Sequence, residues 1–161
     1  MRLARSILAL ALLAALAAFA AGCGGGDDET TPTACFSGAE AYEEALAAAP
    51  GEVRIGGETL ISECLTRNQE GGELAQVGEA LVEAATRIDA EAREDPGGQA
   101  NLELGYLLGA ARRGSEETAG IHSDLLRRLE VAARFAPGKQ PLPPEFTATY
   151  QRGFDAGHEN G

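Results

Sequence analysis

The chain has 161 residues, of which 44% are hydrophobic, and its formal net charge at pH 7 is −12. So acidic a surface repels phosphate polymers and anionic lipid head groups. We therefore expect no nucleic-acid partner and no membrane binding through a cluster of basic residues. Tryptophan is absent and aromatic residues make up 5%, so leucine and alanine must supply most of a thin, helical core.

The first 26 residues have the order of a secretory signal. Arg2 and Arg5 precede an uninterrupted apolar run from Ile7 to Ala21, which ends in the small residues of Ala20-Ala21-Gly22-Cys23. Glycine and aspartate follow at once. A charged start, an apolar stretch and a small-residue cleavage site are the parts of a signal peptide. The run is short for a membrane-spanning helix, which needs about 20 residues; an uncleaved anchor helix is the alternative.

The sequence Ala20-Ala21-Gly22-Cys23 resembles the lipobox of bacterial lipoprotein precursors. The resemblance implies diacylglycerol on the Cys23 thiol, cleavage before Cys23, and acylation of the new amino terminus, for instance with palmitate. The protein would then be anchored to the cell membrane on its extracytoplasmic face. Ala20 stands where leucine is most common, and Ala18-Phe19-Ala20 would also serve as a cleavage site for ordinary secretion. A secreted protein is therefore the alternative.

These features divide the chain into a signal peptide (1–22), a flexible tether (23–34) and one domain (35–161). The tether residues 24–33 are Gly, Asp, Glu, Thr and Pro, which bury too little to offset their ordering entropy. All 25 acidic residues but only 11 of the 13 basic residues follow position 22, so the mature chain would carry a net charge of −14. Solvation of helix faces explains this acidity more simply than cation binding does.

The cysteines agree with an extracytoplasmic location. If Cys23 carries lipid, Cys35 and Cys64 remain as a pair in an oxidising compartment, where a disulfide is expected. Closing a loop of about 30 residues stabilises a domain by about 3 to 4 kcal/mol in the chain-entropy model. The alternative is two unpaired buried thiols.

A first helix and a possible hairpin open the domain. Ser37 and Glu40 form a capping-box pattern, which predicts a helix that begins there and ends at Pro50-Gly51. The alternating residues around Gly56-Gly57 predict a minor β-hairpin near 53–61 or, equally well, an irregular loop.

The strongest helical periodicity spans residues 73–94, where apolar side chains recur every three or four positions: Leu74, Val77, Leu81, Ala84 and Ile88. Its outer face is charged, so we expect an amphipathic helix of about five turns. We place this helix at the centre of the domain. Asp95-Pro96-Gly97-Gly98 ends it.

The next helix begins near Gln99 and contains Gly105 and Gly109. Glycine costs about 1 kcal/mol relative to alanine inside a helix, so the pair predicts close approach of another helix; a ligand lying over bare backbone is the alternative. Gly114-Ser115 resembles a helix end followed by a new start, yet the apolar phase continues across it. Residues 99–135 are one helix or two, with a break at Gly114-Ser115 slightly favoured.

A last helix is expected from Pro144, which suits a first helical position. Its aromatic stripe, Phe146, Tyr150 and Phe154, predicts a wedge that closes the core; an exposed partner-binding stripe is the alternative. Together these patterns predict an all-α domain, a small bundle of four to five helices with at most one minor hairpin.

The sequence holds no phosphate loop, dinucleotide fingerprint, metalloprotease motif, EF-hand or nucleophile elbow. We expect no cofactor and no metal, and no catalytic residue is assigned. His158 lies among the last residues, where we expect fraying. Tyr106, Arg113 and His122 are the residues to suspect if a site assembles in the fold.

These observations favour a lipid-anchored extracytoplasmic module, more a binding or scaffolding protein for another envelope component than an enzyme. The alternative function is a small-ligand receptor or an enzyme whose site assembles around His122.

Overall fold

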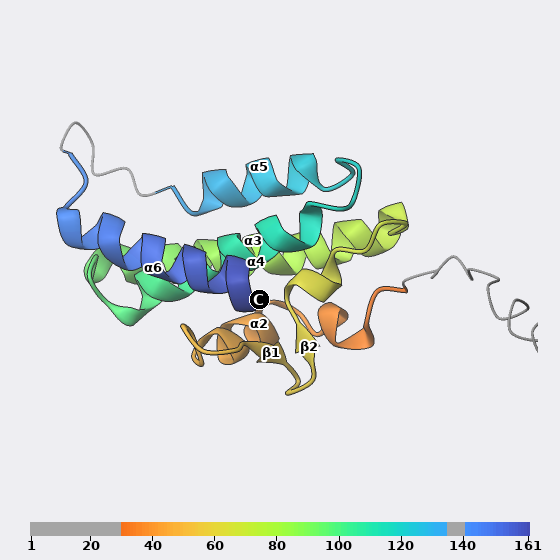
Figure 1. Cartoon of the computed structure of the whole chain (residues 1–161), viewed down its shortest axis with the longest axis horizontal. Helices are drawn as coiled ribbons and strands as arrows, with labels where there is room; N and C mark the ends of the chain where they lie inside the picture. The colour runs from red at the N-terminus through yellow and green to blue at the C-terminus, as the bar shows by residue number, and fades with distance from the viewer. Residues whose placement is uncertain (1–29, 135–140) are drawn as a thin grey trace, which may run out of the picture.

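The computed structural model describes residues 30–134 and 141–161 (Figure 1). The elements in this part of the chain, where η marks a short 3-10 helix, are η2 (Thr33–Phe36), α2 (Ala39–Leu46), β1 (Arg54–Ile55), β2 (Thr59–Leu60), η3 (Ser62–Cys64), α3 (Gly71–Glu94), α4 (Gln99–Ser115), α5 (Ser123–Ala132) and α6 (Pro144–Asn160). The predicted small helical bundle with one minor hairpin is confirmed.

Three long helices form the body of the domain, and shorter elements cover it on two sides. Figure 1 shows α5 on one side of α3, α4 and α6, with α2 and the hairpin on the other side. The hairpin pairs Arg54 with Leu60 and Ile55 with Thr59. Gly56 and Gly57 make its turn with φ values of 61° and 81°, a backbone conformation that glycine adopts without strain.

The central helix is α4, and the prediction that the 73–94 helix is central was wrong. Residues 104–111 of α4 are all buried, and α4 packs against α2, α3, α5 and α6. The physical reason lies in the composition: α4 has apolar or small residues nearly all round, whereas α3 keeps a charged outer face.

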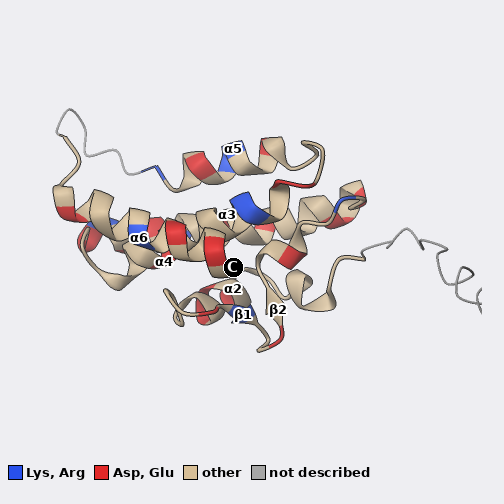
Figure 2. Cartoon of the chain, viewed as in Figure 1, with Lys and Arg blue, Asp and Glu red and all other residues tan. Residues whose placement is uncertain are grey.

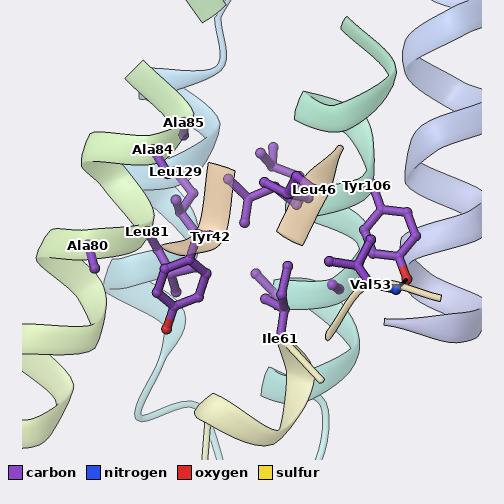
Figure 3. Packing of buried hydrophobic residues seen from close by; sticks show 14 of the residues in the cluster. Tyr42, Leu46, Val53, Ile61, Ala80, Leu81, Ala84, Ala85, Tyr106 and Leu129 are labelled. Atoms are coloured by element: carbon purple, nitrogen blue, oxygen red, sulfur yellow. Dashed lines mark hydrogen bonds between the residues drawn. The ribbon is translucent and has the colours of Figure 1, made fainter. Parts of the chain in front are cut away.

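The predicted inner face of α3 is confirmed, because Val77, Leu81, Ala84 and Ile88 are buried. Figure 3 shows this face beside side chains from α2, the hairpin region, α4 and α5. The buried side chains labelled there are Tyr42, Leu46, Val53, Ile61, Ala80, Leu81, Ala84, Ala85, Tyr106 and Leu129. Tyr106 lies in this core with its hydroxyl oxygen accepting a hydrogen bond from the Val53 N–H at 3.2 Å.

Helices α4 and α6 touch backbone to backbone. A Cβ built on Gly105 would lie 2.9 Å from the nitrogen of Phe154, and one built on Gly109 would lie 2.8 Å from the nitrogen of His158. Gly153 and Gly157 of α6 are equally close to the backbone of α4. The predicted close approach is thus confirmed, and it is a second helix that lies over the bare backbone. Because the two contacts advance together along both helices, α4 and α6 run parallel.

The aromatic stripe of α6 serves partly as the predicted wedge. Phe146 is buried, and Tyr150 and Phe154 are half-buried against the core. Ring centroids in the stripe are 6.1 Å and 6.5 Å apart. Burial raises the pKa of Tyr150 to about 12, with a smaller contribution from the negative charge of Glu130 on α5.

The described part of the predicted 99–135 region, residues 99–134, contains two helices, but the break lies later than predicted. Helix α4 continues through Gly114 to Ser115, and α5 begins at Ser123. The chain turns at Ala119 and Gly120, which have φ values of 51° and 85°. Gly114 has a different role, because a Cβ there would lie 2.9 Å from the Cα of Ser62. It lets η3 approach α4.

The predicted capping box at Ser37 was wrong. Helix α2 starts one residue later than that cap requires, after Gly38 with φ 81°, and no side chain caps it. Ser37 instead ends η2, with its N–H bonded to the Ala34 carbonyl. Gly38 joins the 3-10 helix η2 to the α-helix α2, and glycine adopts the positive φ of this position without strain.

Candidate functional site

A pocket of about 770 Å³ lies where the N-terminal segment joins the domain. We call it the tether pocket. It is lined by Thr30, Pro32, Ser62, Glu63, Leu65, Thr66, Arg67, Arg113, Gly114, Glu116, Glu117 and Thr118. Three segments distant in sequence thus meet around one hollow, which is the arrangement of a binding site rather than of a chance groove within one element.

The N-terminal wall belongs to the domain, although residues up to 34 were expected to be tether. Thr31 is buried, its hydroxyl donates to Glu73 Oε2 at 2.9 Å, and it accepts a hydrogen bond from Gln69 Nε2 at 2.9 Å. A few residues later, Cys35 is joined to Cys64 by the predicted disulfide, whose Cα atoms are 5.5 Å apart. The segment from Thr31 to Cys35 is therefore fixed beside the pocket.

The opposite walls come from η3 and the end of α4, and these two elements are in close contact. Gly114 provides the space for the Ser62 backbone, as described above. The Ser62 hydroxyl also donates to the carbonyl oxygen of Gly161 at 2.5 Å. The guanidinium of Arg113 donates to the carbonyl oxygen of Glu159 at 2.5 Å. Residues at the end of α6 and just after it thus hold both walls through hydrogen bonds to Ser62 and Arg113.

A buried hydrogen-bond network lies next to the pocket lining. Gln69 Nε2 donates to the Cys64 carbonyl oxygen at 2.9 Å, so the amide oxygen of Gln69 must be the acceptor for His122 Nε2–H at 2.8 Å. Nε2 of His122 therefore carries a hydrogen, and the buried Nδ1 has no partner among the described residues. Burial lowers the pKa of His122.

The charged groups of the lining divide into paired and unpaired ones. Arg67 forms an ion pair with Glu117, and Glu116 Oε1 lies 2.8 Å from Nε2 of His158. Arg113 and Glu63 differ, because each bonds only to a neutral backbone group: Arg113 to the Glu159 carbonyl, and Glu63 Oε2 to the Leu60 N–H at 2.8 Å. Within residues 30–134 and 141–161, neither forms an ion pair.

The three suspected residues do not come together. Arg113 lines the tether pocket, whereas Tyr106 and His122 are fully buried and are not part of its lining. His122 is linked to the lining indirectly, since Gln69 bonds to Thr31, whose hydroxyl lies 3.4 Å from the hydroxyl of Thr66. His158 is not frayed as expected, because α6 continues to Asn160 and the His158 ring stacks on Phe154 with centroids 6.3 Å apart.

Sequence reasoning missed Glu63, Arg67 and Gln69. They lie between the hairpin and α3, where no hydrophobic period or motif marks a residue as important. Cys23 and the signal peptide lie outside the described residues, so lipid attachment stays a prediction.

No cluster of three or more histidine, cysteine or acidic side chains suited to a metal ion occurs in the part of the chain that the structure describes. None of the helices there combines the length and the apolar composition that crossing a bilayer requires. Figure 2 shows acidic residues spread over several helices, with few basic residues among them. The chain matches no known protein-family model, and it shows no significant similarity to a curated protein or to a solved structure.

Proposed function

We propose that the protein is a lipid-anchored extracytoplasmic binding module, and that the tether pocket is where it binds another envelope component. The observation that carries this proposal is the position of the pocket: Thr30 and Pro32 form part of its lining. The proposed anchor, Cys23, precedes Thr30 by seven residues. An extended chain covers at most about 3.6 Å per residue, so Thr30 would lie within about 25 Å of the anchor.

The fixed N-terminal segment supports this reading. Because Thr31 and the disulfide hold residues 31–35 on the domain, the domain cannot turn the pocket far from the membrane surface. A ligand at or near that surface would meet the pocket before it meets the distant ends of α3 and α5.

The lining supports recognition rather than catalysis. Hydroxyl groups and charged side chains of both signs surround a hollow of ligand size. Both histidines near it are already engaged: His122 is buried and bonded to Gln69, and His158 contacts Glu116. Groups that are fixed before binding cost less entropy when a ligand arrives.

Site-specific photocrosslinking in intact cells tests the proposed function. A photoreactive amino acid replaces Glu117 in the pocket lining, and the matched control replaces Glu94 at the far end of α3. We expect a discrete crosslinked partner from position 117 and none from position 94. Equal crosslinking from both positions, or a partner captured only from position 94, would exclude the tether pocket as the binding site.

The anchor has its own test. Metabolic labelling with an alkyne fatty acid should tag the wild-type protein, and Cys23→Ala should abolish the label and release the protein from the membrane fraction. A variant that is tagged as strongly as the wild type refutes lipidation at Cys23. An unlabelled wild type found in the medium would replace anchoring with simple secretion.

A further inference from the structure

We propose that the tether pocket takes a compact zwitterionic ligand, whose anionic group binds Arg113 and whose ammonium group binds Glu63. This inference rests on the proposed binding function of the same pocket and names the chemistry of its ligand. It follows from which charges of the lining are already paired, from where the unpaired ones lie, and from the charge of the whole protein.

The ion pair between Arg67 and Glu117 leaves Arg113 as the arginine of the lining without a carboxylate partner, and Glu63 and Glu116 as the glutamates without an arginine partner. The Arg67–Glu117 pair satisfies two charged groups, and Glu116 faces His158. Arg113 and Glu63 have only neutral backbone groups as hydrogen-bond partners, and each keeps donors or acceptors for a charged group. The Glu63 carboxylate also interacts electrostatically with Arg54, with which it forms no ion pair. Hydrogen bonds between two charged groups are shorter and stronger than bonds to neutral partners.

The two unpaired charges lie on different walls. Glu63 is part of η3, and Arg113 belongs to the last turn of α4. The walls are held together by the Gly114–Ser62 contact, yet the Glu63 carboxylate and the Arg113 guanidinium are more than 4 Å apart, because no ion pair joins them. A ligand with opposite charges at its two ends can bridge this separation.

The overall charge restricts the ligand further. With three glutamates in the lining and a net charge of −12 for the chain, a ligand with several negative charges would be repelled. A purely cationic ligand would approach readily but would meet Arg113. A neutral zwitterion avoids both penalties and uses both unpaired groups.

Two sources supply this chemistry beside a membrane: a soluble zwitterion, and the phosphoethanolamine head group of a phospholipid. Both carry an ammonium a few bonds from an anionic oxygen group. The shared chemistry is the proposal, and the experiment separates the sources.

The probe is glycerophosphoethanolamine, titrated by isothermal calorimetry and by chemical shift into the full mature protein purified in detergent. Ethanolamine carries its positive charge alone, and the phosphodiester glycerophosphoglycerol carries its single negative charge alone. We expect the zwitterion to bind about tenfold or more tightly than either relative, since each lost charged hydrogen bond costs at least that factor.

Glu63→Gln is the decisive variant. A glutamine keeps an oxygen for the Leu60 N–H but removes the charge, so we expect affinity to fall about tenfold with an unchanged melting temperature. Glu58→Gln makes the same charge change in the adjacent hairpin outside the lining and should bind like the wild type. Arg113→Gln should lose a similar factor, and its control is the neighbouring Arg112→Gln.

Equal affinity for the zwitterion and either single-charge relative would overturn the proposal, as would full affinity in Glu63→Gln. Binding to lipid nanodiscs of phosphatidylethanolamine, compared with nanodiscs of phosphatidylcholine, then assigns the source. A preference for phosphatidylethanolamine that Glu63→Gln abolishes identifies the head group. Binding of the free probe without this lipid preference identifies a soluble zwitterion. Photocrosslinking from position 117 to a partner in cells, with no zwitterion binding, would remove this inference and leave the proposed function standing.

Discussion

Replacing Gly105 by alanine should destabilise the domain by about 2 kcal/mol or more. The added methyl group would lie 2.9 Å from the nitrogen of Phe154, and closer still to the carbonyl oxygen of Tyr150. Favourable carbon contacts need about 3.5 Å, so the two helices must separate by roughly 1 Å. A gap of that size forfeits about a quarter to a half of the dispersion energy along the contact.

The two opposing terms set the size of the effect. Overpacking typically costs about 1 to 3 kcal/mol, and more where backbone rather than a side chain is the obstacle. Alanine recovers at most about 1 kcal/mol of helix propensity. At about 4 °C per kcal/mol for a domain of this size, the melting temperature should fall by about 8 °C or more.

Thermal and urea unfolding, followed by circular dichroism, measure this change. Gly72→Ala is the matched control, since it lies in α3 with open space around the new methyl group; it should be neutral or stabilising by up to about 1 kcal/mol. The double variant Gly105→Ala/Gly109→Ala should cost less than the sum of the single variants, because one separation of the helices relieves both clashes. An unchanged melting temperature for Gly105→Ala would refute the close packing of α4 and α6.

Three further predictions concern the disulfide, the buried histidine and the tyrosines. Replacing Cys35 and Cys64 by serine should lower the free energy of unfolding by about 3 to 4 kcal/mol, and reducing agent should weaken the wild type but not this variant. Because burial lowers the pKa of folded His122 below the usual value of 6.5, the unfolded chain binds the extra proton first as the pH falls. Stability should therefore decrease below about pH 6.5, and His122→Gln should flatten that part of the curve of unfolding free energy against pH; an equally steep curve in the variant would assign the effect elsewhere. Burial raises the pKa of Tyr42, Tyr106 and Tyr150. Absorbance at about 295 nm should therefore show less phenolate near pH 10 in the folded protein than in the unfolded chain, and stability should fall above about pH 10, where the unfolded chain loses those protons first.

Helices with a regular apolar period could be predicted, because local spacing alone decides which face is buried. The inner face of α3 followed from this spacing. Two other local signals were also sufficient: Pro144 marked the start of α6, and the glycine pair at 105 and 109 marked a close contact. A glycine inside a helix signals that something must come close. It does not say which element comes, and the partner proved to be α6, some 45 residues later in the chain.

Features that depend on contacts between distant segments could not be predicted. Gly114 looked like a helix end, but its small size serves contact with Ser62, and the chain turns instead at Gly120. Glu63 and Gln69 lie in an irregular segment, and their roles arise only when η3 packs on α4 and when Thr31 returns to the domain. Of the three suspected residues, Arg113 alone lines the pocket.

The parallel packing of α4 and α6 has an electrostatic consequence. Each helix carries a partial negative charge of about half an electron at its C-terminal end, from carbonyl groups without intrahelical partners. In parallel helices both negative ends lie together, here beside the tether pocket. Arg112 and Arg113 lie in the last turn of α4, and His158 lies in the last turn of α6. Arg113 goes further, since it extends from the end of one helix to the Glu159 carbonyl of the other. Its charge thus serves two helix ends at once, which fixes a cation at the pocket of a strongly acidic protein.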